Sequence, residues 1–134
     1  MDQKTQEKLM MYQILHRQLE QINEQAMLVE RKEMEIAISK EALEELNNIK
    51  EGNETLIPIG GETFTFGKVK DPKKTLVNIG AGILVEKNVK DAIAMLDEKT
   101  VEINRIKEKL QKDSTTLTEK LTEIANEVEQ AQKQ

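Results

Sequence analysis

The sequence predicts an α+β fold in which two long helices form an antiparallel helical-hairpin coiled coil and two β-hairpins lie between them along the chain. Two observations predict this fold. All six glycines and both prolines fall between Gly52 and Gly82, so the flanking segments contain no strong helix breaker. In both flanking segments, apolar residues recur every seven positions over at least four heptads, which is the spacing of a coiled coil.

The composition agrees with helices rather than with a compact core. Of 134 residues, 34% are charged and only 2% aromatic, and the net charge of −5 comes from acidic and basic residues interleaved along both flanking segments. Such a surface repels nucleic acid and anionic membranes. The chain has no cysteine, no apolar run of the ~18 residues that a membrane helix needs and no signal-peptide core, so we expect a cytoplasmic protein.

The first helix is predicted over residues 4–51. We expect Gly52 and Asn53 to end it, because glycine readily takes the left-handed conformation that closes a helix. Two rows should face the partner helix, the first with Leu15, Ile22, Val29, Ile36 and Leu43, and the second with Tyr12, Leu19, Ala26, Glu33, Lys40 and Asn47. A weaker apolar row predicts that the contact drifts near the end of this helix: Met27, Met34, Ile38, Ala42, Leu46 and Ile49.

The second helix is predicted over residues 88–132. Asn88 is a favourable N-cap, and Asp91 complements the exposed amides of the first turn. Its rows hold Leu96, Ile103, Leu110, Leu117, Ile124 and Ala131, and Ile93, Thr100, Lys107, Ser114, Leu121 and Val128. If the helices are antiparallel, Glu33, Lys40 and Asn47 should face the neighbourhood of Lys107, Thr100 and Ser114. Such polar contacts would fix the register at some cost in stability.

Two β-hairpins are predicted within residues 55–87. Gly60-Gly61 should turn the first hairpin and Gly80-Ala81-Gly82 the second, with a turn through Pro72 between them. Pro58 lacks an amide hydrogen, so its strand is expected to be short or to lie at an edge. Four short strands would make a patch of sheet whose apolar face nothing else in the chain can cover. Exposed strand edges require pairing, so the chain reads as a subunit of an assembly.

These residues resemble a known family. The stretch Ile57-Pro58-Ile59-Gly60-Gly61 and the segment 77–87 (VNIGAGILVEK), set between two coiled-coil helices, are similar to the α subunit of archaeal prefoldin over essentially the whole chain, residues 1–134. Two hairpins indicate the α class, because the β class has one. Glu62 departs from the smaller, less acidic residue expected at its turn.

The resemblance implies a function and a set of partners. It implies an ATP-independent co-chaperone that assembles with prefoldin β subunits as a hexamer of two α and four β subunits. The hairpins would oligomerise into a β-barrel from which the coiled coils project, and non-native client proteins would be held at the coiled-coil tips and delivered to a group II chaperonin. Some α-class relatives form filaments instead.

Client contact is expected where the two ends of the chain meet. Met10, Met11 and Ile14 lie outside the row of Tyr12 and Leu15, so the first helix is apolar on several sides there, and flexible Met side chains suit varied partners. A local bundle could cover them instead, and heptad position alone accounts for Leu121, Ile124 and Val128. The predicted contact set is Leu9, Met10, Met11, Ile14, Leu15, Leu121, Ile124, Ala125 and Val128.

Subunit assembly is expected to use the apolar residues of the hairpins. Phe64 and Phe66, two positions apart, should share one face of a strand, where packing explains them better than a ligand platform. The predicted assembly set is Ile57, Ile59, Phe64, Phe66, Val77, Ile79, Ile83 and Val85.

The sequence predicts no enzyme, cofactor or metal site. The segment Gly80-Ala81-Gly82 lacks the third glycine and the following helix of a dinucleotide loop. His16 is the single histidine and no cysteine accompanies it, which favours a solvated side chain over zinc. The main alternative to a co-chaperone is a structural coiled-coil protein that forms a filament or scaffold through its hairpins; the apolar residues Met10 and Met11 argue against it.

Overall fold

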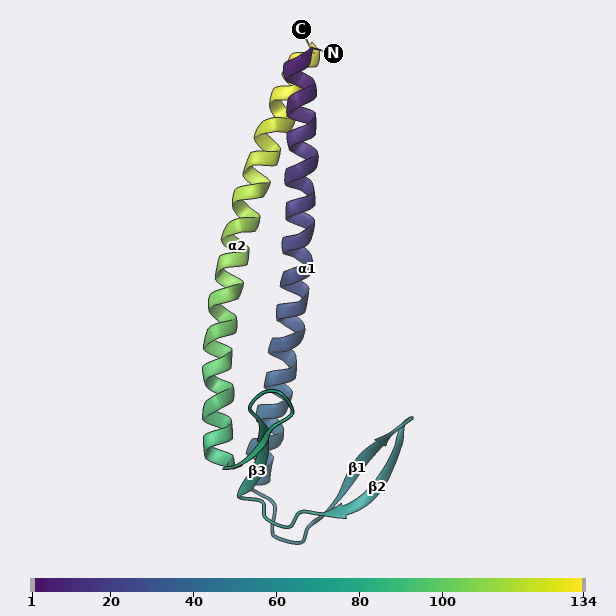
Figure 1. Cartoon of the computed structure of the whole chain (residues 1–134), viewed down its shortest axis with the longest axis vertical. Coiled ribbons are helices and arrows are strands. Elements are labelled where there is room, and N and C mark those ends of the chain that lie inside the picture. Colours follow the sequence, from purple (N-terminus) through teal and green to yellow (C-terminus); the bar gives the residue numbers. More distant parts are fainter. Residues whose placement is uncertain (1, 134) are drawn as a thin grey trace. The chain divides into compact units, whose positions relative to one another are not determined.

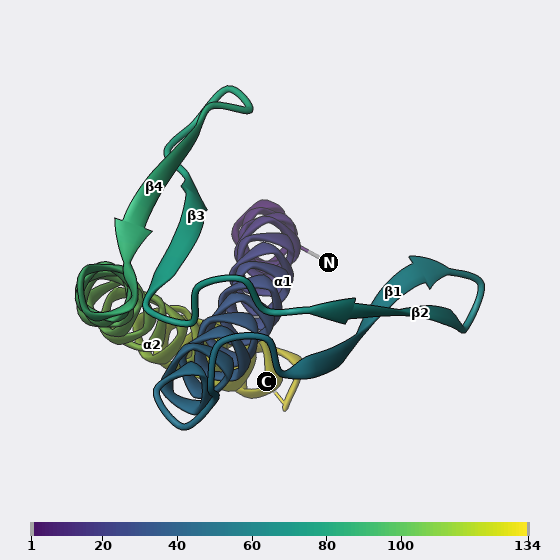
Figure 2. The same ribbon diagram turned by 90° about the horizontal axis from the view of Figure 1, so that it is seen from below.

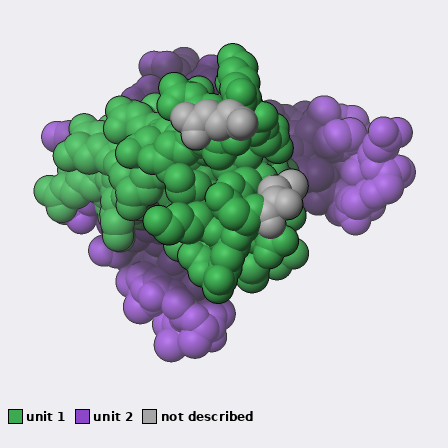
Figure 3. Space-filling model, turned by 90° about the horizontal axis from the view of Figure 1, so that it is seen from above, with its two compact units in different colours: residues 1–33, 101–134 green, residues 34–100 purple. Residues whose placement is uncertain are grey.

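The computed structural model describes residues 2–133 and confirms the α+β class. Helix α1 (Gln3–Leu46) is followed by strands β1 (Glu54–Gly60), β2 (Thr63–Lys68), β3 (Lys74–Asn78) and β4 (Leu84–Asn88), and helix α2 (Val89–Lys133) ends the chain (Figure 1). The chain divides into two compact units, which comprise residues 1–33 with 101–134, and residues 34–100 (Figure 3). None of the described helices is long and apolar enough to span a membrane.

In the first unit, the two helices run antiparallel. Lys8 near the start of α1 pairs with Glu127 near the end of α2 at 3.2 Å, and Glu33 pairs with Lys107 at 3.1 Å. The residues that face the partner helix are the predicted heptad rows. Their most buried members here are Ile103, Leu117, Leu121 and Val128, and the predicted α1 positions from Tyr12 to Glu33 are half-buried. Among the row members of this unit that the structure describes, only Ala131, at the very end of its row, is exposed.

The effect of the pair between Glu33 and Lys107 on stability can be tested. The Lys107 ammonium donates to both carboxylate oxygens of Glu33, at 3.1 and 3.3 Å, from a partly buried position. Replacing both residues by leucine should raise the free energy of unfolding by about 1 kcal/mol, because partly buried ion pairs seldom outweigh apolar packing. Lys107→Leu alone should lower the free energy of unfolding, since Glu33 loses its partner. Guanidinium denaturation measures both; a double variant less stable than the single one would contradict this account.

In the second unit, Lys40 makes a polar contact with α2 as predicted, but its partner is a different residue. Lys40 donates to Asp97 at 2.8 Å rather than meeting Thr100, whose hydroxyl donates to the carbonyl of Leu96. The hydrogen bond to Asp97 and its negative charge hold the pKa of Lys40 above its ordinary value of 10.5. The pair therefore contributes throughout the neutral range and is lost only as the pH rises through that raised pKa. The predicted neighbourhood of Asn47 and Ser114 is wrong: Asn47 lies in a turn of the second unit, and Ser114 lines a groove with Ala26 in the first.

Helix α1 ends at Leu46, so the predicted end at residue 51 is wrong. The amides of Asn47, Asn48 and Ile49 each donate to a carbonyl three residues back, which tightens the last turn and stops the helix. Asparagine favours turns over helix interiors. Gly52, which has the expected left-handed φ of +84°, already donates to the carbonyl of Val69 and so extends the first hairpin instead.

Both helices begin at a side-chain cap. The amide of Thr5 donates to the Asp2 carboxylate at 2.8 Å, and the amide of Asp91 donates to the Asn88 side-chain oxygen at 2.9 Å. Hydrogen bonding of the Thr5 side chain and backbone lowers the pKa of Asp2 below its ordinary value of 3.8, so that cap is lost only as the pH falls through the lowered pKa. The cap at Asn88 confirms the sequence-based expectation.

Removing the cap at Asn88 should destabilise α2. Asn88→Ala leaves a helix amide without its partner, and we expect the free energy of unfolding to fall by about 1 kcal/mol. Asn88→Asp is the matched control, because aspartate caps equally well. Thermal unfolding followed by circular dichroism compares the two; equal losses in both variants would show that the cap does not act through this hydrogen bond.

The two predicted hairpins are confirmed, and they form two separate two-stranded sheets rather than one patch of four strands. Strand β1 pairs only with β2, and β3 only with β4, both antiparallel. Figure 2 shows hairpin 1 (β1 and β2) and hairpin 2 (β3 and β4) as distinct ribbons. Every strand therefore keeps one unpaired edge.

Two non-glycine residues take left-handed backbone conformations in the hairpin turns. Glu62 has φ of 61° and follows Gly61 at 58°, and Ala81 has φ of 50° and precedes Gly82 at 76°. Hairpin turns of type I′ require positive φ at both central positions, which glycine or asparagine adopts with less strain. The departure noted at Glu62 therefore falls on a conformationally demanding position.

Candidate functional site

The terminal end of the first unit carries an exposed apolar surface on α1. Met10, Met11 and Ile14 are 64%, 49% and 51% exposed. They lie outside the helix contact because Tyr12 and Leu15 occupy the inward positions and are half-buried. We call Met10, Met11 and Ile14 the tip patch. Large apolar side chains grouped at one place on a surface are typical of interaction sites.

A small groove lies between the two helices at the same end. It has a volume of about 240 Å³, and its lining includes Leu9 and Tyr12 from α1 with Ile124 and Ala125 from α2. Leu9 and Ile124 are half-buried, whereas Ala125 is exposed. Residues predicted from both ends of the sequence thus meet around one apolar depression.

Two of the predicted contact residues are placed differently. Leu121 is 7% exposed and Val128 is 9% exposed, because both side chains pack between the helices. Leu15 is half-buried for the same reason. Their burial confirms the heptad positions predicted for Leu121 and Val128, and their contact with clients stays a prediction.

The apolar row through Met27 is exposed over most of its length, and its last two members, Leu46 and Ile49, are half-buried. In the first unit Met27 is 63% exposed, while Val29 and Glu33 keep the inward positions. In the second unit Met34 and Ile38 are each 65% exposed, and Ile36 is buried at 6%. Near the end of α1, Leu46 is half-buried whereas Asn47 of the predicted second row is exposed, so the drift predicted from the sequence is limited to that end.

Hairpin 1 presents an apolar face to solvent. Leu56 lies opposite Phe66, and Pro58 lies opposite Phe64, so all four share one face as the spacing of the two phenylalanines predicted. Phe66 is 75% exposed, and Leu56 and Phe64 are exposed as well. On the other face the Ile57 side chain covers Gly67, where a Cβ atom would clash with it.

Hairpin 2 is apolar near its turn. Val77 lies opposite Val85, and both are half-buried. Ile79 and Ile83 are each 57% exposed and flank the turn, where the Ile79 amide donates to the Ile83 carbonyl at 3.0 Å. All eight residues predicted for assembly thus lie in or beside the two hairpins, and none is fully buried.

A larger apolar groove in the second unit was not predicted from the sequence. It has a volume of about 500 Å³ and lies between the end of α1, strand β3 and the first turns of α2. Its lining includes Ala42, Leu46, Leu76, Met95 and Leu96. The sequence did contain a signal for this groove, because several apolar residues lie outside the heptad rows, Met95 and Leu76 among them. We call this depression the base groove.

His16 forms no metal centre with its neighbours. Its ring stacks on Tyr12 with centroids 6.2 Å apart, and its Nδ1 atom lies 3.4 Å from the Glu20 carboxylate. Within residues 2–133, no cluster of three or more histidine, cysteine, aspartate or glutamate side chains is arranged to hold a metal ion. The exposed His16 side chain agrees with the solvated position expected for it.

Comparison with known families decides the identity. Residues 15–134 match the family model for Prefoldin, described as a prefoldin subunit. The chain belongs to the prefoldin family. Membership makes it a chaperone component of a family whose subunits are not enzymes.

The similar curated proteins are prefoldin α subunits of archaea. The chain is 32% identical to the prefoldin subunit alpha of Archaeoglobus fulgidus over 99% of its own length and 92% of that protein. It is 29% identical to the prefoldin subunit alpha of Pyrococcus horikoshii over 90% of its own length and 82% of that protein. The α-class resemblance read from the two hairpins is confirmed.

Solved structures show the same fold. A filamentous PFD from Methanocaldococcus jannaschii, determined by cryo-EM, matches with a TM-score of 0.77 at 19% identity, over 87% of this chain and 96% of that one. The crystal structure of the prefoldin beta subunit from Thermococcus strain KS-1 matches with a TM-score of 0.61 at 19% identity, over 97% and 93% of the two chains. These likenesses support the fold of two long helices and two hairpins. In the present chain the hairpins form two separate two-stranded sheets.

Proposed function

We propose that this prefoldin-family chain is the α subunit of an ATP-independent co-chaperone that captures non-native proteins at its coiled-coil tips. Its hairpins assemble it with prefoldin β subunits, as two α and four β subunits, through a shared β-barrel in the cytoplasm. The complex then delivers its clients to a group II chaperonin. The observation that carries this proposal is the tip patch, where three large apolar side chains remain about half exposed or more at the end of a helix pair.

The physical argument rests on many weak contacts. Non-native proteins expose apolar segments of varied shape, and methionine side chains adapt to such segments. One half-exposed patch offers little affinity by itself. Several tips held on one assembled body raise the effective concentration of contacts, so clients are retained without a tight single site. No nucleotide is required for this mode of binding.

The hairpins support the assembly part of the proposal. Unpaired strand edges and exposed apolar faces are unfavourable in water and are normally covered by another chain. Phe66 and the two turn-flanking isoleucines Ile79 and Ile83 are all more than half exposed. The chain therefore exposes apolar residues for assembly on its hairpins and a separate set of apolar residues for client contact in the tip patch.

A filament or scaffold is the second candidate. It is favoured by the structural likeness to a filamentous PFD, which was determined as such in Methanocaldococcus jannaschii. In that function the helices would be spacers, and removal of the tips would have no effect on aggregation of other proteins.

Light scattering from a denatured client protein, diluted into the assembled complex, tests the proposal. The complex is prepared with the intact chain or with a chain lacking residues 1–15 and 121–134, and its mass is checked by native mass spectrometry. We expect protection to be lost with the tips in particles whose mass falls only by the deleted residues. Equal protection by both forms would reject client capture at these tips, and filaments without protection would favour the scaffold.

A further inference from the structure

Methionine is the side chain through which this protein can undergo reversible oxidation. The sequence contains no cysteine and six methionines, five of which the structure describes. Peroxides convert the methionine side chain into methionine sulfoxide, which is polar and chiral. The change has its largest effect where a methionine packs in a core or against a binding partner. The position of each methionine therefore decides what its oxidation does.

Two of the methionines are neighbours in the tip patch. Met10 and Met11 are 64% and 49% exposed, so an oxidant in solution reaches both side chains. Ile14 follows Met10 by four positions and Met11 by three, which places all three on one side of the helix. Two of the three side chains of the tip patch are therefore oxidisable, and only Ile14 would stay apolar after oxidation.

The contact between the helices contains no sulfur at this end. The inward positions beside the tip patch belong to Leu9, Tyr12 and Leu15, which are half-buried. The buried residues of α2 at the same end are Leu121 and Val128. Oxidation of the tip patch therefore leaves the helix pair intact. A sulfoxide oxygen there is solvated in the free protein, and it costs free energy only when a client segment covers it.

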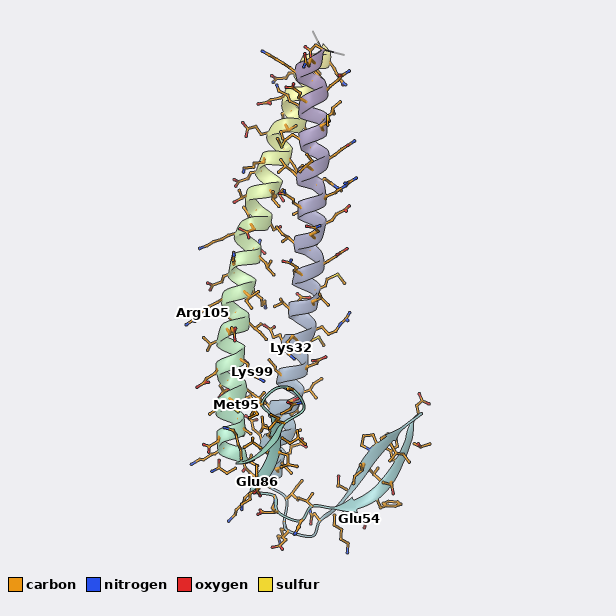
Figure 4. The ribbon with its side chains drawn as sticks, in the orientation of Figure 1. Lys32, Glu54, Glu86, Met95, Lys99 and Arg105 are labelled. Atoms are coloured by element: carbon orange, nitrogen blue, oxygen red, sulfur yellow. The ribbon has the colours of Figure 1, made fainter. Side chains whose placement is uncertain are left out.

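The other described methionines supply an internal comparison. Met27 and Met34 are 63% and 65% exposed on α1, outside the tip patch. Met95 is half-buried near the start of α2, where it lines the base groove (Figure 4). Four of the described methionines are thus exposed to an oxidant, and only two of these four belong to the surface proposed to hold clients.

We propose that the tip patch is an oxidation site at which peroxide switches client capture off. Hydrogen peroxide transfers one oxygen atom to the sulfur of Met10 and of Met11. Each sulfur loses two electrons and becomes a sulfoxide, and each peroxide is reduced to water. The oxidised tip patch presents two polar groups to a client, so its apolar segments are no longer held.

The modification is reversible. Methionine sulfoxide reductases return the sulfur to a thioether and release the oxygen as water, while two thiols are oxidised to a disulfide. The inference rests on client capture at the tips in the proposed function, and it adds a chemical means of regulating that site.

The experiment oxidises this chain alone, so that methionines of its partner subunits stay unchanged. The full chain is treated with hydrogen peroxide, catalase removes the peroxide, and the chain is then assembled with untreated partner subunits. Peptide mass spectrometry measures the sulfoxide at each methionine, and native mass spectrometry checks the mass of the complex. We expect oxidation of the tip patch to raise the amount of complex needed to prevent client aggregation roughly tenfold, because two apolar contacts are lost.

Two pairs of substitutions locate the effect. Met10→Leu with Met11→Leu keeps the patch apolar without sulfur, and the treated variant should protect clients as well as its untreated form does. Met27→Leu with Met34→Leu is the matched control, because it removes two similarly exposed sulfurs elsewhere on α1. This control should stay as sensitive to peroxide as the unchanged chain. Reductases for both sulfoxide epimers, supplied with dithiothreitol, should restore protection by the oxidised unchanged chain.

Three results would overturn the inference: full protection by a complex whose Met10 and Met11 are oxidised, equal loss of protection in the leucine variant of the tip patch, or no recovery after the sulfoxides have been reduced. Failure of the proposed function gives a different result, because removal of residues 1–15 and 121–134 would then leave protection unchanged. If this inference alone fails, the truncated chain is inactive and the oxidised chain still protects.

Discussion

Replacement of Met10, Met11 and Ile14 by serine is expected to abolish most of the client protection given by the assembled complex. These side chains are 64%, 49% and 51% exposed, and burying the exposed part of each against a client should contribute about 1 kcal/mol. Loss of all three contacts at one tip then corresponds to roughly a hundredfold weaker binding. Client aggregation followed by light scattering at several ratios of complex to client measures the change.

Two exposed apolar residues of the same helix supply the matched control. Met27 and Leu28 are 63% and 60% exposed but lie far from the chain ends in sequence. Their replacement by serine removes the exposed apolar area of two side chains instead of three, and it should leave protection unchanged if capture belongs to the tip. Equal losses from both sets of substitutions would show that capture depends on general apolar exposure along the helix.

Replacement of Ile79 and Val85 by glutamate is expected to have the opposite effect, loss of assembly with preserved helices. Val85 is half-buried opposite Val77, and Ile79 flanks the turn at 57% exposed. Burying a carboxylate in an apolar subunit interface costs several kcal/mol, which is enough to weaken association by more than a hundredfold. Native mass spectrometry of the chain mixed with its partner subunits measures the loss.

Val101→Glu controls for the added negative charge, because Val101 is 51% exposed on α2 outside the hairpins. It should assemble normally. Full-size oligomers from the variant with both hairpin substitutions would mean that subunits meet through other surfaces, and the assembly role given to hairpin 2 would then be withdrawn.

The parts of the fold set by repetition were predictable. Five inward positions from Leu15 to Leu43 and their partners in α2 follow from heptad spacing alone, because each position is supported by its neighbours in the row. The cap at Asn88 was predictable for a different reason, since one side-chain oxygen and one amide three residues later suffice to define it.

The parts set by competition between local preferences were not predictable. Residues 47–51 contain no glycine or proline, yet α1 stops at Leu46 because three successive short-range hydrogen bonds and the pairing of Gly52 with Val69 replace helix bonds. The separation of the two sheets depends on the path of the linker between β2 and β3, which strand patterns do not specify.

The candidate site shows the same division. Periodicity identified Met10, Met11 and Ile14 as residues outside the helix contact, and they are exposed. It also placed Leu121 and Val128 in a row that faces the other helix, and both side chains are buried there. The base groove was missed since its walls come from three segments distant in sequence, which only the folded chain brings together.

Photo-crosslinking from single positions tests most directly whether clients contact the tip. A photoreactive amino acid is placed at position 11, 66 or 101 of the chain, the complex is assembled with its partner subunits, and a denatured client is added before irradiation. The account predicts client adducts from position 11, adducts to other subunits from position 66 and few adducts from position 101. Client adducts from positions 66 or 101 as abundant as those from position 11 would contradict capture at the coiled-coil tips.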